Sequence, residues 1–246
     1  MIKWLFFDVG NVILNDDPAM AMYYKYIYEV LNQNGKNITF NELLQHREQA
    51  IIQNRDGKHY YTVGLKYFEA KRWRKEIRLL FSKLMDNWES ISPLIPGIVP
   101  VIETLSRKYN LGLIANQPRI TEAILKDHQL LQYFKVNCIS ELVGYKKPDR
   151  RIFKYALKSA ECSPEEAVMI GDRIDNDVAP AKAMGLKTLW FKLPLEKKGY
   201  EPANELEKLY FQSIKRACVS QLPPLTNEEQ PNFVAESFEE IVSILS

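Results

Sequence analysis

Two acidic clusters, far apart in the chain, each follow a short run of apolar residues. Asp8 lies at the end of a strand-like run that begins at Ile2, and Asp172 and Asp177 come after the run that begins at Ala167. In parallel α/β sheets, ligands bind just outside the carboxyl ends of the strands. Carboxylates that meet there need a cation between them, and a site built only of oxygen ligands selects a hard ion such as Mg²⁺. The pattern predicts a Mg²⁺ site with a nucleophilic or ligating aspartate, suited to phosphate chemistry.

Short apolar runs and helical segments alternate over most of the chain, and this alternation is typical of a doubly wound parallel α/β sheet. After the first strand, we expect strands at residues 111–115, 136–140, 167–170 and 187–191, with helices at 101–108, 120–127 and 151–160. Three of the strands then end at Asp8, Ala115 and Asp172. The predicted fold is therefore a Rossmannoid sheet whose carboxyl edge carries the acidic residues.

One long helical stretch, from about Pro18 to Trp88, interrupts this alternation directly after the first strand. Within it, Thr39 followed by Glu42 is typical of a capping box at a helix start, and Asp56 with the next glycine is a turn signal. We therefore predict an inserted α-helical cap domain.

The predicted domain boundaries follow from this interruption. The helical cap domain covers residues 17–95, and the α/β core domain covers residues 1–16 and 96–246. Inside the core, we expect residues 194–232 to form a surface excursion with a helix around 204–219. The last segment, 233–245, is expected to form a short strand and a closing helix.

The composition gives an ordinary globular balance, with 26% charged and 46% hydrophobic residues. A net charge of +2 gives no electrostatic argument for nucleic acid. Cys138, Cys162 and Cys218 are widely spaced and form no CxxC, which favours a reducing compartment without disulfides. The first strand begins at Ile2, which leaves no room for a signal peptide, and no apolar run has membrane-spanning length. We expect a cytoplasmic protein without a membrane partner, as a monomer or homodimer.

In their order along the chain, the predicted strands and the acidic residues that follow them resemble the haloacid dehalogenase superfamily of hydrolases. Most members of this superfamily are Mg²⁺-dependent phosphatases. The resemblance covers residues 1–16 and 96–191, and the helical insert resembles the cap that follows the first motif in many members. Members carry four motifs: Asp-x-Asp on the first strand, Ser or Thr on a second, Lys on a third element, and paired acids after a fourth strand.

Four residues of this chain match those motifs. Asp8 matches the nucleophile, and Lys147, in the sequence Gly-Tyr-Lys-Lys-Pro-Asp, matches the lysine motif. Asp172 and Asp177 match the acids that ligate the metal. Any one of these motifs alone is weak, but these four residues in the expected order make a specific resemblance.

Two positions depart from the family pattern. Gly10 stands where most phosphatases of the family have a second aspartate, the general acid and base. Ala115, followed by Asn116, stands where a hydroxyl group binds the phosphoryl group, so these two residues are the candidate substrate-binding positions. An Asp-x-Gly-Asn motif does occur in a subgroup resembling sugar-phosphate phosphatases. Because general acid–base catalysis contributes roughly 10²–10⁴-fold, we expect slow turnover.

The resemblance implies a phosphatase acting on a small phosphorylated metabolite, with a sugar phosphate as one candidate. Asp8 would attack phosphorus and form an aspartyl-phosphate. Asp8, the backbone carbonyl of Gly10 and Asp172 would hold Mg²⁺, with Asp177 in support. Lys147 would neutralise the nucleophile and the phosphoryl oxygens. The alternative is a catalytically impaired protein of the same fold that binds a phosphorylated ligand or a protein partner.

Other interpretations of the acidic residues are also open. A dehalogenase is a weaker option, because that branch usually loses the metal acids and this chain has both Asp172 and Asp177. Acids at a helix start are also favoured by capping and by the helix dipole. Asp175 fits such a cap and is left out of the site.

A basic run, Lys71–Lys75 with Arg78, could bind an anionic ligand, but it is better explained as the solvated face of an amphipathic helix. His46, His59 and His128 have no partners at metal-ligand spacing. We therefore assign neither group to the site.

Overall fold

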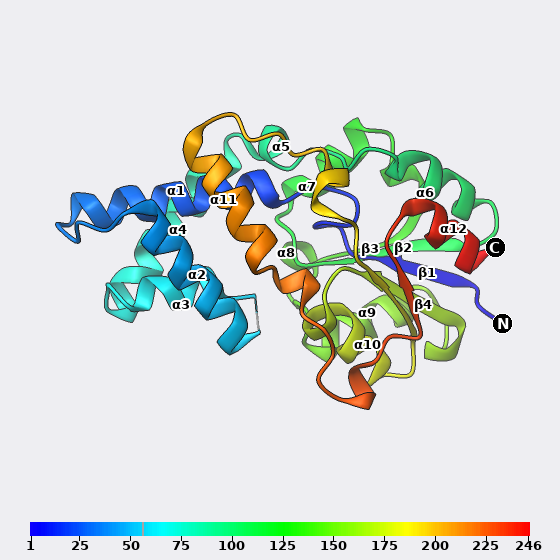
Figure 1. Ribbon diagram of the computed structural model, residues 1–246. Helices are drawn as coiled ribbons and strands as arrows, with labels where there is room; N and C mark the ends of the chain where they lie inside the picture. Colours follow the sequence, from blue (N-terminus) through cyan, green and yellow to red (C-terminus); the bar gives the residue numbers. More distant parts are fainter. Residues whose placement is uncertain (56) are drawn as a thin grey trace. The chain divides into compact units, whose positions relative to one another are not determined.

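The computed structural model describes residues 1–55 and 57–246 (Figure 1). Asp56, the first residue of the predicted turn, lies outside the described residues. The chain forms two compact units. The sheet unit consists of Met1–Asn15, Pro93–Gly199 and Ser220–Ser246, and the helical unit consists of Asp16–Ser92 and Tyr200–Val219.

The sheet unit is built on six parallel strands in the order β3-β2-β1-β4-β5-β6. The strands are β1 (Trp4–Phe7), β2 (Asn110–Ala115), β3 (Phe134–Ile139), β4 (Ala167–Gly171), β5 (Lys187–Phe191) and β6 (Phe233–Ala235). This arrangement confirms the predicted doubly wound α/β fold. The central position of β1 explains its continuous apolar sequence, because both faces of a central parallel strand are covered.

Helices cover both faces of the sheet. They are α6 (Ile98–Ser106), α7 (Ile120–Asp127), α8 (Ser140–Val143), α9 (Arg150–Ser159), α10 (Ala179–Lys182) and α12 (Phe238–Leu245). Single turns are η1 (Leu131–Tyr133), η2 (Pro164–Glu166), η3 (Ile174–Val178), η4 (Leu195–Lys198), η5 (Val219–Gln221) and η6 (Asn227–Glu229). Figure 1 shows α9 and α10 on one face, and α6 and α12 on the other. Trp4 and Phe6 of β1 share a buried apolar cluster with Ile152 and Phe153 of α9.

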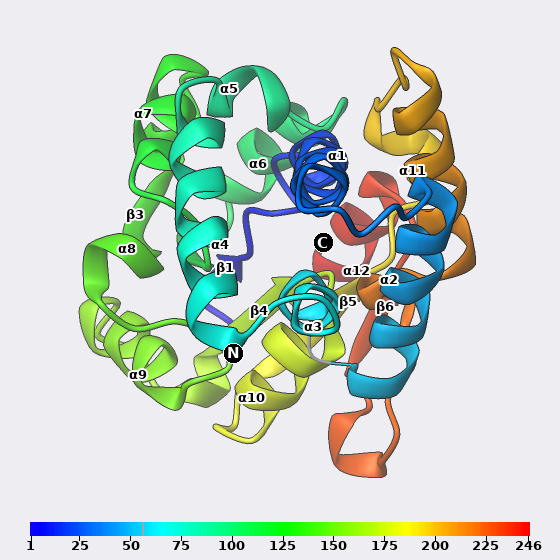
Figure 2. The ribbon, with the colours of Figure 1, turned by 90° about the vertical axis from the view of Figure 1, so that its left-hand side faces the viewer.

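The helical unit contains α1 (Asp17–Gln33), α2 (Phe40–Asn54), α3 (His59–Leu65), α4 (Ala70–Met85), α5 (Trp88–Ile91) and α11 (Glu205–Arg216). Figure 2 looks along α1, with α4 on one side and α2 and α11 on the other. The predicted capping box is confirmed, because the Thr39 hydroxyl accepts from the Glu42 amide and the Glu42 carboxylate accepts from the Thr39 amide. Trp73, Leu80 and Leu84 form the buried face of α4.

The extent of the helical unit differs from the predicted boundaries at Tyr200–Val219, which the sequence interpretation placed with the core. The reason is that α11 packs against α1 and α2. A polar anchor fixes this packing, because the buried Arg47 of α2 donates hydrogen bonds to Ser213 Oγ at 3.0 Å and to the Ala217 carbonyl at 2.9 Å. Nothing in the local sequence around residue 204 indicates a partner so far away along the chain.

None of the helices within residues 1–55 and 57–246 combines the length and the apolar character that crossing a bilayer requires.

Candidate functional site

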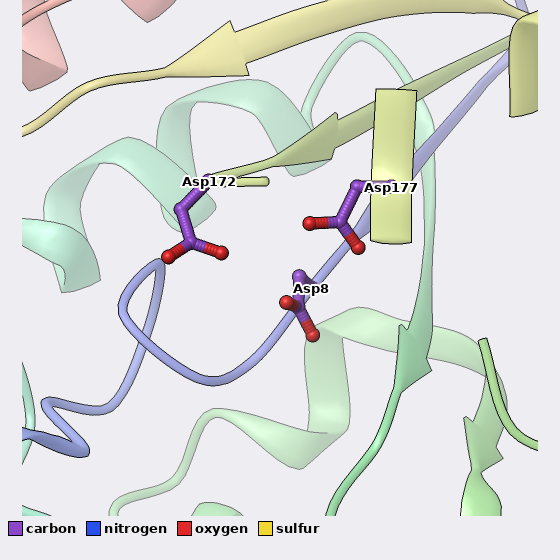
Figure 3. A group of neighbouring side chains, drawn as sticks. All are labelled: Asp8, Asp172 and Asp177. Atoms are coloured by element: carbon purple, nitrogen blue, oxygen red, sulfur yellow. The ribbon is translucent and has the colours of Figure 1, made fainter. Parts of the chain in front are cut away.

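The parallel pairing of β1 with β4 brings the two acidic clusters together. Phe7 pairs with Ile170, and the Asp8 amide donates to the Ile170 carbonyl at 2.8 Å, so Asp8 and Asp172 leave neighbouring strands at the same edge. Carboxylate oxygens of Asp8, Asp172 and Asp177 all lie within 4.8 Å of one another, and all three residues are buried. Figure 3 shows these side chains gathered at the carboxyl end of the sheet.

Asp177 reaches the cluster through η3, a π-helical turn directly after β4. Such turns occur frequently at functional sites. The Arg173 amide donates to Asp177 Oδ2 at 3.0 Å and fixes the carboxylate. Gly171 makes the approach possible, because a Cβ at this position would lie 2.4 Å from Asp177 Cγ. Only glycine lets the strand end and the carboxylate come this close.

Lys147 links two of the three carboxylates. Its ammonium lies 2.7 Å from Asp8 Oδ1 and 2.5 Å from Asp177 Oδ1, and its side chain is fully buried. The Val9 amide also donates to Asp8 Oδ1, at 2.7 Å. Asp8 is therefore held in one orientation by its own backbone neighbour and by a lysine from a different part of the chain.

Asn116, a predicted substrate-binding residue, forms hydrogen bonds with the backbone of Lys147. Its side-chain Nδ2 donates to the Lys147 carbonyl at 2.9 Å, and its Oδ1 accepts from the Lys147 amide at 2.7 Å. The amide of Asn116 therefore fixes the backbone that carries the lysine. The neighbouring Ala115 ends β2, and its methyl group is fully buried, so it offers no side-chain donor at this edge.

Burial makes this cluster electrostatically unfavourable without a cation. It raises the pKa of Asp172 well above its usual range, and the carboxylates of Asp177 and Asp8 add to this effect. Burial also raises the pKa of Asp177, to about 6, although Lys147 acts in the opposite direction. For Lys147, burial lowers the pKa, but the charges of Asp177 and Asp8 outweigh it and raise the pKa above its ordinary value. Three carboxylates thus face one directly paired ammonium.

A divalent cation fits this donor set. The three carboxylates are hard oxygen donors at ligand-sharing distance, and Mg²⁺ binds through a few carboxylates while it keeps several waters. Within the described residues, no second group of His, Cys, Asp and Glu side chains has such geometry. The chemistry of the donors therefore agrees with a hard divalent ion. The participation of the Gly10 carbonyl stays a prediction.

Two features of the site were not predicted. Asp175 forms an ion pair with Arg173, which turns both side chains toward each other, and the helix cap expected from Asp175 is not formed.

Lys198 is buried in the sheet unit, with its ammonium 3.1 Å from Asn11 Oδ1. The sequence around Lys198 gives no signal for this position, because two consecutive lysines before a glycine are typical of a solvated turn.

A parallel sheet with buried carboxylates and a paired lysine at its carboxyl edge defines an α/β enzyme class suited to phosphoryl chemistry. The family model described as haloacid dehalogenase-like hydrolase matches residues 5–191. This chain belongs to the haloacid dehalogenase-like hydrolase family. The predicted enzyme class, a phosphatase-like hydrolase of this family, is confirmed.

Individual proteins resemble this chain over most of its length. A glyceraldehyde 3-phosphate phosphatase of Pyrococcus furiosus is 29% identical over 212 residues, which cover 81% of this chain and 87% of the relative. The structure of a phosphatase from Thermococcus onnurineus superposes with a TM-score of 0.64 and 22% identity, covering 100% of this chain and 98% of that one. The magnesium-bound structure of the hydrolase YfnB from Bacillus subtilis gives a TM-score of 0.59 and 18% identity, covering 99% and 98%. These two structural similarities show the fold.

Proposed function

We propose that this protein is a Mg²⁺-dependent phosphatase that hydrolyses a small phosphorylated metabolite through an aspartyl-phosphate on Asp8. The observation that carries the proposal is the buried cluster of Asp8, Asp172 and Asp177, with Lys147 in contact with two of them. A surface cap or an ordinary ion pair does not require three mutually close, buried carboxylates, because their repulsion costs stability.

The substrate class comes from the relatives. A glyceraldehyde 3-phosphate phosphatase and a phosphoglycolate phosphatase are among the similar proteins, and both names refer to small phosphate monoesters. The exposed basic run on α4 does not need to bind a polyanion, since Lys71, Arg74 and Lys75 are solvated side chains of an amphipathic helix. We therefore favour a small phosphate monoester, with a sugar phosphate as one candidate.

In the proposed reaction, a carboxylate oxygen of Asp8 attacks phosphorus in line with the leaving oxygen, and water later hydrolyses the acyl phosphate. Lys147 holds the Asp8 carboxylate and faces the incoming phosphoryl oxygens with a positive charge that the carboxylates of Asp177 and Asp8 favour. Asn116 keeps the Lys147 backbone in place. Asp8, Asp172 and Asp177, with the carbonyl of Gly10, are the residues that would hold Mg²⁺. When bound, this ion supplies charge stabilisation at the phosphoryl oxygens.

The missing groups set the expected rate. Gly10 carries no acid, and the buried methyl of Ala115 gives no hydrogen bond to the phosphoryl group. Phosphoryl transfer depends mainly on positioning and electrostatics, so the remaining groups can support it. We therefore propose a functioning enzyme of modest rate.

The test is a phosphate-release screen of wild type, with and without Mg²⁺, over phosphate monoesters that include glyceraldehyde 3-phosphate, phosphoglycolate and sugar phosphates. Asp8→Asn keeps the shape of the side chain and removes the nucleophile, so it should abolish turnover rather than only weaken binding. Asp175→Asn is the matched control, because Asp175 follows the same strand as Asp172 but lies outside the cluster and pairs with Arg173.

Two results contradict the proposal. Activity that survives Asp8→Asn would exclude the aspartyl-phosphate. A wild-type protein that is inactive on every ester, yet is stabilised by one of them, would favour the alternative of a protein that binds a phosphorylated ligand.

A further inference from the structure

Lys198 is a buried lysine to which the proposed mechanism gives no role. It is the last residue of η4, the single turn that follows β5, and only 5% of its surface is exposed. Its neighbour Lys197 is exposed. Burying an ammonium group is costly unless it is paired and hydrogen-bonded, so the position of Lys198 needs a physical reason.

Both ends of Lys198 are held by the loop that leaves the nucleophile. Its ammonium lies 3.1 Å from Asn11 Oδ1, and its backbone carbonyl accepts from Asn15 Nδ2 at 3.0 Å. Asn11 has a φ of 58°, in the left-handed region that asparagine tolerates better than most residues. The loop and η4 are therefore joined at both ends of Lys198, and the ammonium lies against the side chain of the residue that follows Gly10, the position without an acid.

The charge of Lys198 also acts on the carboxylate cluster. Burial and the two neighbouring aspartates raise the pKa of Asp172, and the positive charges of Lys198 and Arg173 act in the opposite direction. Lys198 is therefore within electrostatic range of Asp172, whereas Lys147 contacts Asp8 and Asp177. Lys147 comes from the segment after β3 and α8, and Lys198 from the turn after β5, and in the strand order β3 and β5 lie on opposite sides of β1.

We propose that Lys198 binds the leaving-group oxygen of the phosphate ester and stabilises the negative charge that develops there. This inference rests on the proposed function. As Asp8 forms its bond to phosphorus, the electron pair of the breaking P–O bond moves to the leaving oxygen, and the alcohol product takes its proton from water. A preorganised cation at that oxygen lowers the barrier. It replaces part of what an aspartate at position 10 would provide.

This role identifies the class of substrate that benefits. An ester with a poor leaving group, such as an alkyl or sugar phosphate, develops a large negative charge on oxygen and needs the cation. An ester with a good leaving group, such as 4-nitrophenyl phosphate, needs it much less. A lysine that only binds the phosphoryl group, or only supports the loop, would affect both substrates equally.

The experiment compares wild type, Lys198→Met and the control Lys197→Met on 4-nitrophenyl, phenyl and 4-methoxyphenyl phosphate. We expect Lys198→Met to lower kcat/KM for 4-nitrophenyl phosphate by no more than about 10-fold. For the two esters with poorer leaving groups, we expect a loss of roughly 10²-fold or more. Lys197→Met should leave the whole series unchanged.

Equal losses across the series, or no loss at all, would overturn the inference. Both results leave the proposed function intact, because wild type still turns over and still depends on Asp8. Absence of turnover by wild type would instead overturn the proposed function and this inference with it.

A second variant covers the possibility that Lys198→Met does not fold, which a circular-dichroism melt would reveal. Asn11→Ala keeps the lysine and removes one oxygen that its ammonium contacts. We expect it to lower kcat/KM for the poorer leaving groups more than for 4-nitrophenyl phosphate. Equal losses in this variant would contradict the inference in the same way.

Discussion

Each of the two units buries a cation, but the two cations have opposite surroundings. In the helical unit, Arg47 faces neutral oxygens and aromatic rings, with the Tyr210 ring centre 5.1 Å from its guanidinium. In the sheet unit, Lys147 faces carboxylates that outnumber it. Buried charge therefore has two uses in this chain. The first arrangement stabilises the fold, whereas the second costs stability and gathers hard oxygen donors of the kind that suit a divalent cation.

The hydrogen bonds show the same contrast. Arg47 Nη1 donates to Ser213 Oγ and to the carbonyls of Ser213 and Ala217, so one charge satisfies several acceptors at the end of α11. Asp172 has the reverse situation, since its carboxylate is buried among other acids and its pKa is raised well above the usual range by that burial. Substitutions at the two places should therefore change stability in opposite directions.

The largest effect is expected for Asp172→Asn. It should lower Mg²⁺-dependent turnover about 100-fold or more, because the ion loses a charged ligand. The same change should raise the free energy of unfolding of the metal-free protein at pH 7.5, by about 1 kcal/mol, since it removes one of several crowded buried charges. Phosphate release and urea unfolding in EDTA measure the two effects. A less stable metal-free variant would show that the cluster is structural.

The next largest effect is expected for Arg47→Met, which keeps the length of the side chain and removes the charge. The free energy of unfolding should fall by about 3 kcal/mol, because buried acceptors on Ser213 and Ala217 lose hydrogen bonds from a charged donor. Urea unfolding measures the loss. Arg74→Met is the control, because Arg74 is an exposed residue of α4 in the same unit. If the two variants were equally stable, the anchor of α11 would have to lie elsewhere.

The pH dependence of stability provides a third, intermediate effect. The folded-state pKa of Asp177 is raised from 3.8 to about 6, so its protonated form is favoured in the folded protein. Its contribution to stability is fully present below the unfolded pKa of 3.8 and is lost as the pH rises through about 6. In EDTA, we expect wild type to lose about 2 kcal/mol relative to Asp177→Asn between pH 4 and pH 7.5. Parallel profiles of stability against pH for the two proteins would contradict the raised pKa of Asp177 in the folded protein.

The same titration predicts how Mg²⁺ acts. Because the ion binds ionised carboxylates, its stabilising effect on the melting temperature should be larger at pH 7.5 than at pH 5. A Mg²⁺ effect of the same size at both values would indicate binding outside the cluster.

The smallest effect is expected on the basic face of α4. Arg74→Ala and Lys75→Ala remove exposed charges. Because surface substitutions away from special contacts change stability little, the melting temperature should stay within about 2 °C of wild type. Turnover of small esters should also be unchanged. Reduced turnover with an unchanged melting temperature would assign this face a role in binding substrate.

The central fold could be predicted from sequence because its signals are local. Apolar runs of strand length, separated by helical segments, indicate a parallel sheet, and β1, β2 and β4 lie where the runs are. The convergence of Asp8 and Asp172 follows as well, because neighbouring parallel strands end at the same edge. Lys147 was found through its motif, and the structure places it against Asp8 and Asp177.

Other features depended on contacts between segments far apart in the chain. The assignment of α11 to the helical unit depends on Arg47 and on packing against α1 and α2. The two hydrogen bonds between the Asn116 side chain and the Lys147 backbone depend on how the segment after β2 and the segment after α8 lie side by side. No local pattern at either partner carries this information.

The sequence by itself thus determined the order of strands and helices and the acids that meet at the carboxyl edge, because strand period and strand direction are set by neighbouring residues. Only the tertiary structure decided which lysines are buried and what they face. Lys197 and Lys198 are adjacent and identical in type, yet one is exposed and the other lies against Asn11. Burial and pairing of a charge are properties of the assembled surroundings, and these arise only when distant segments pack together.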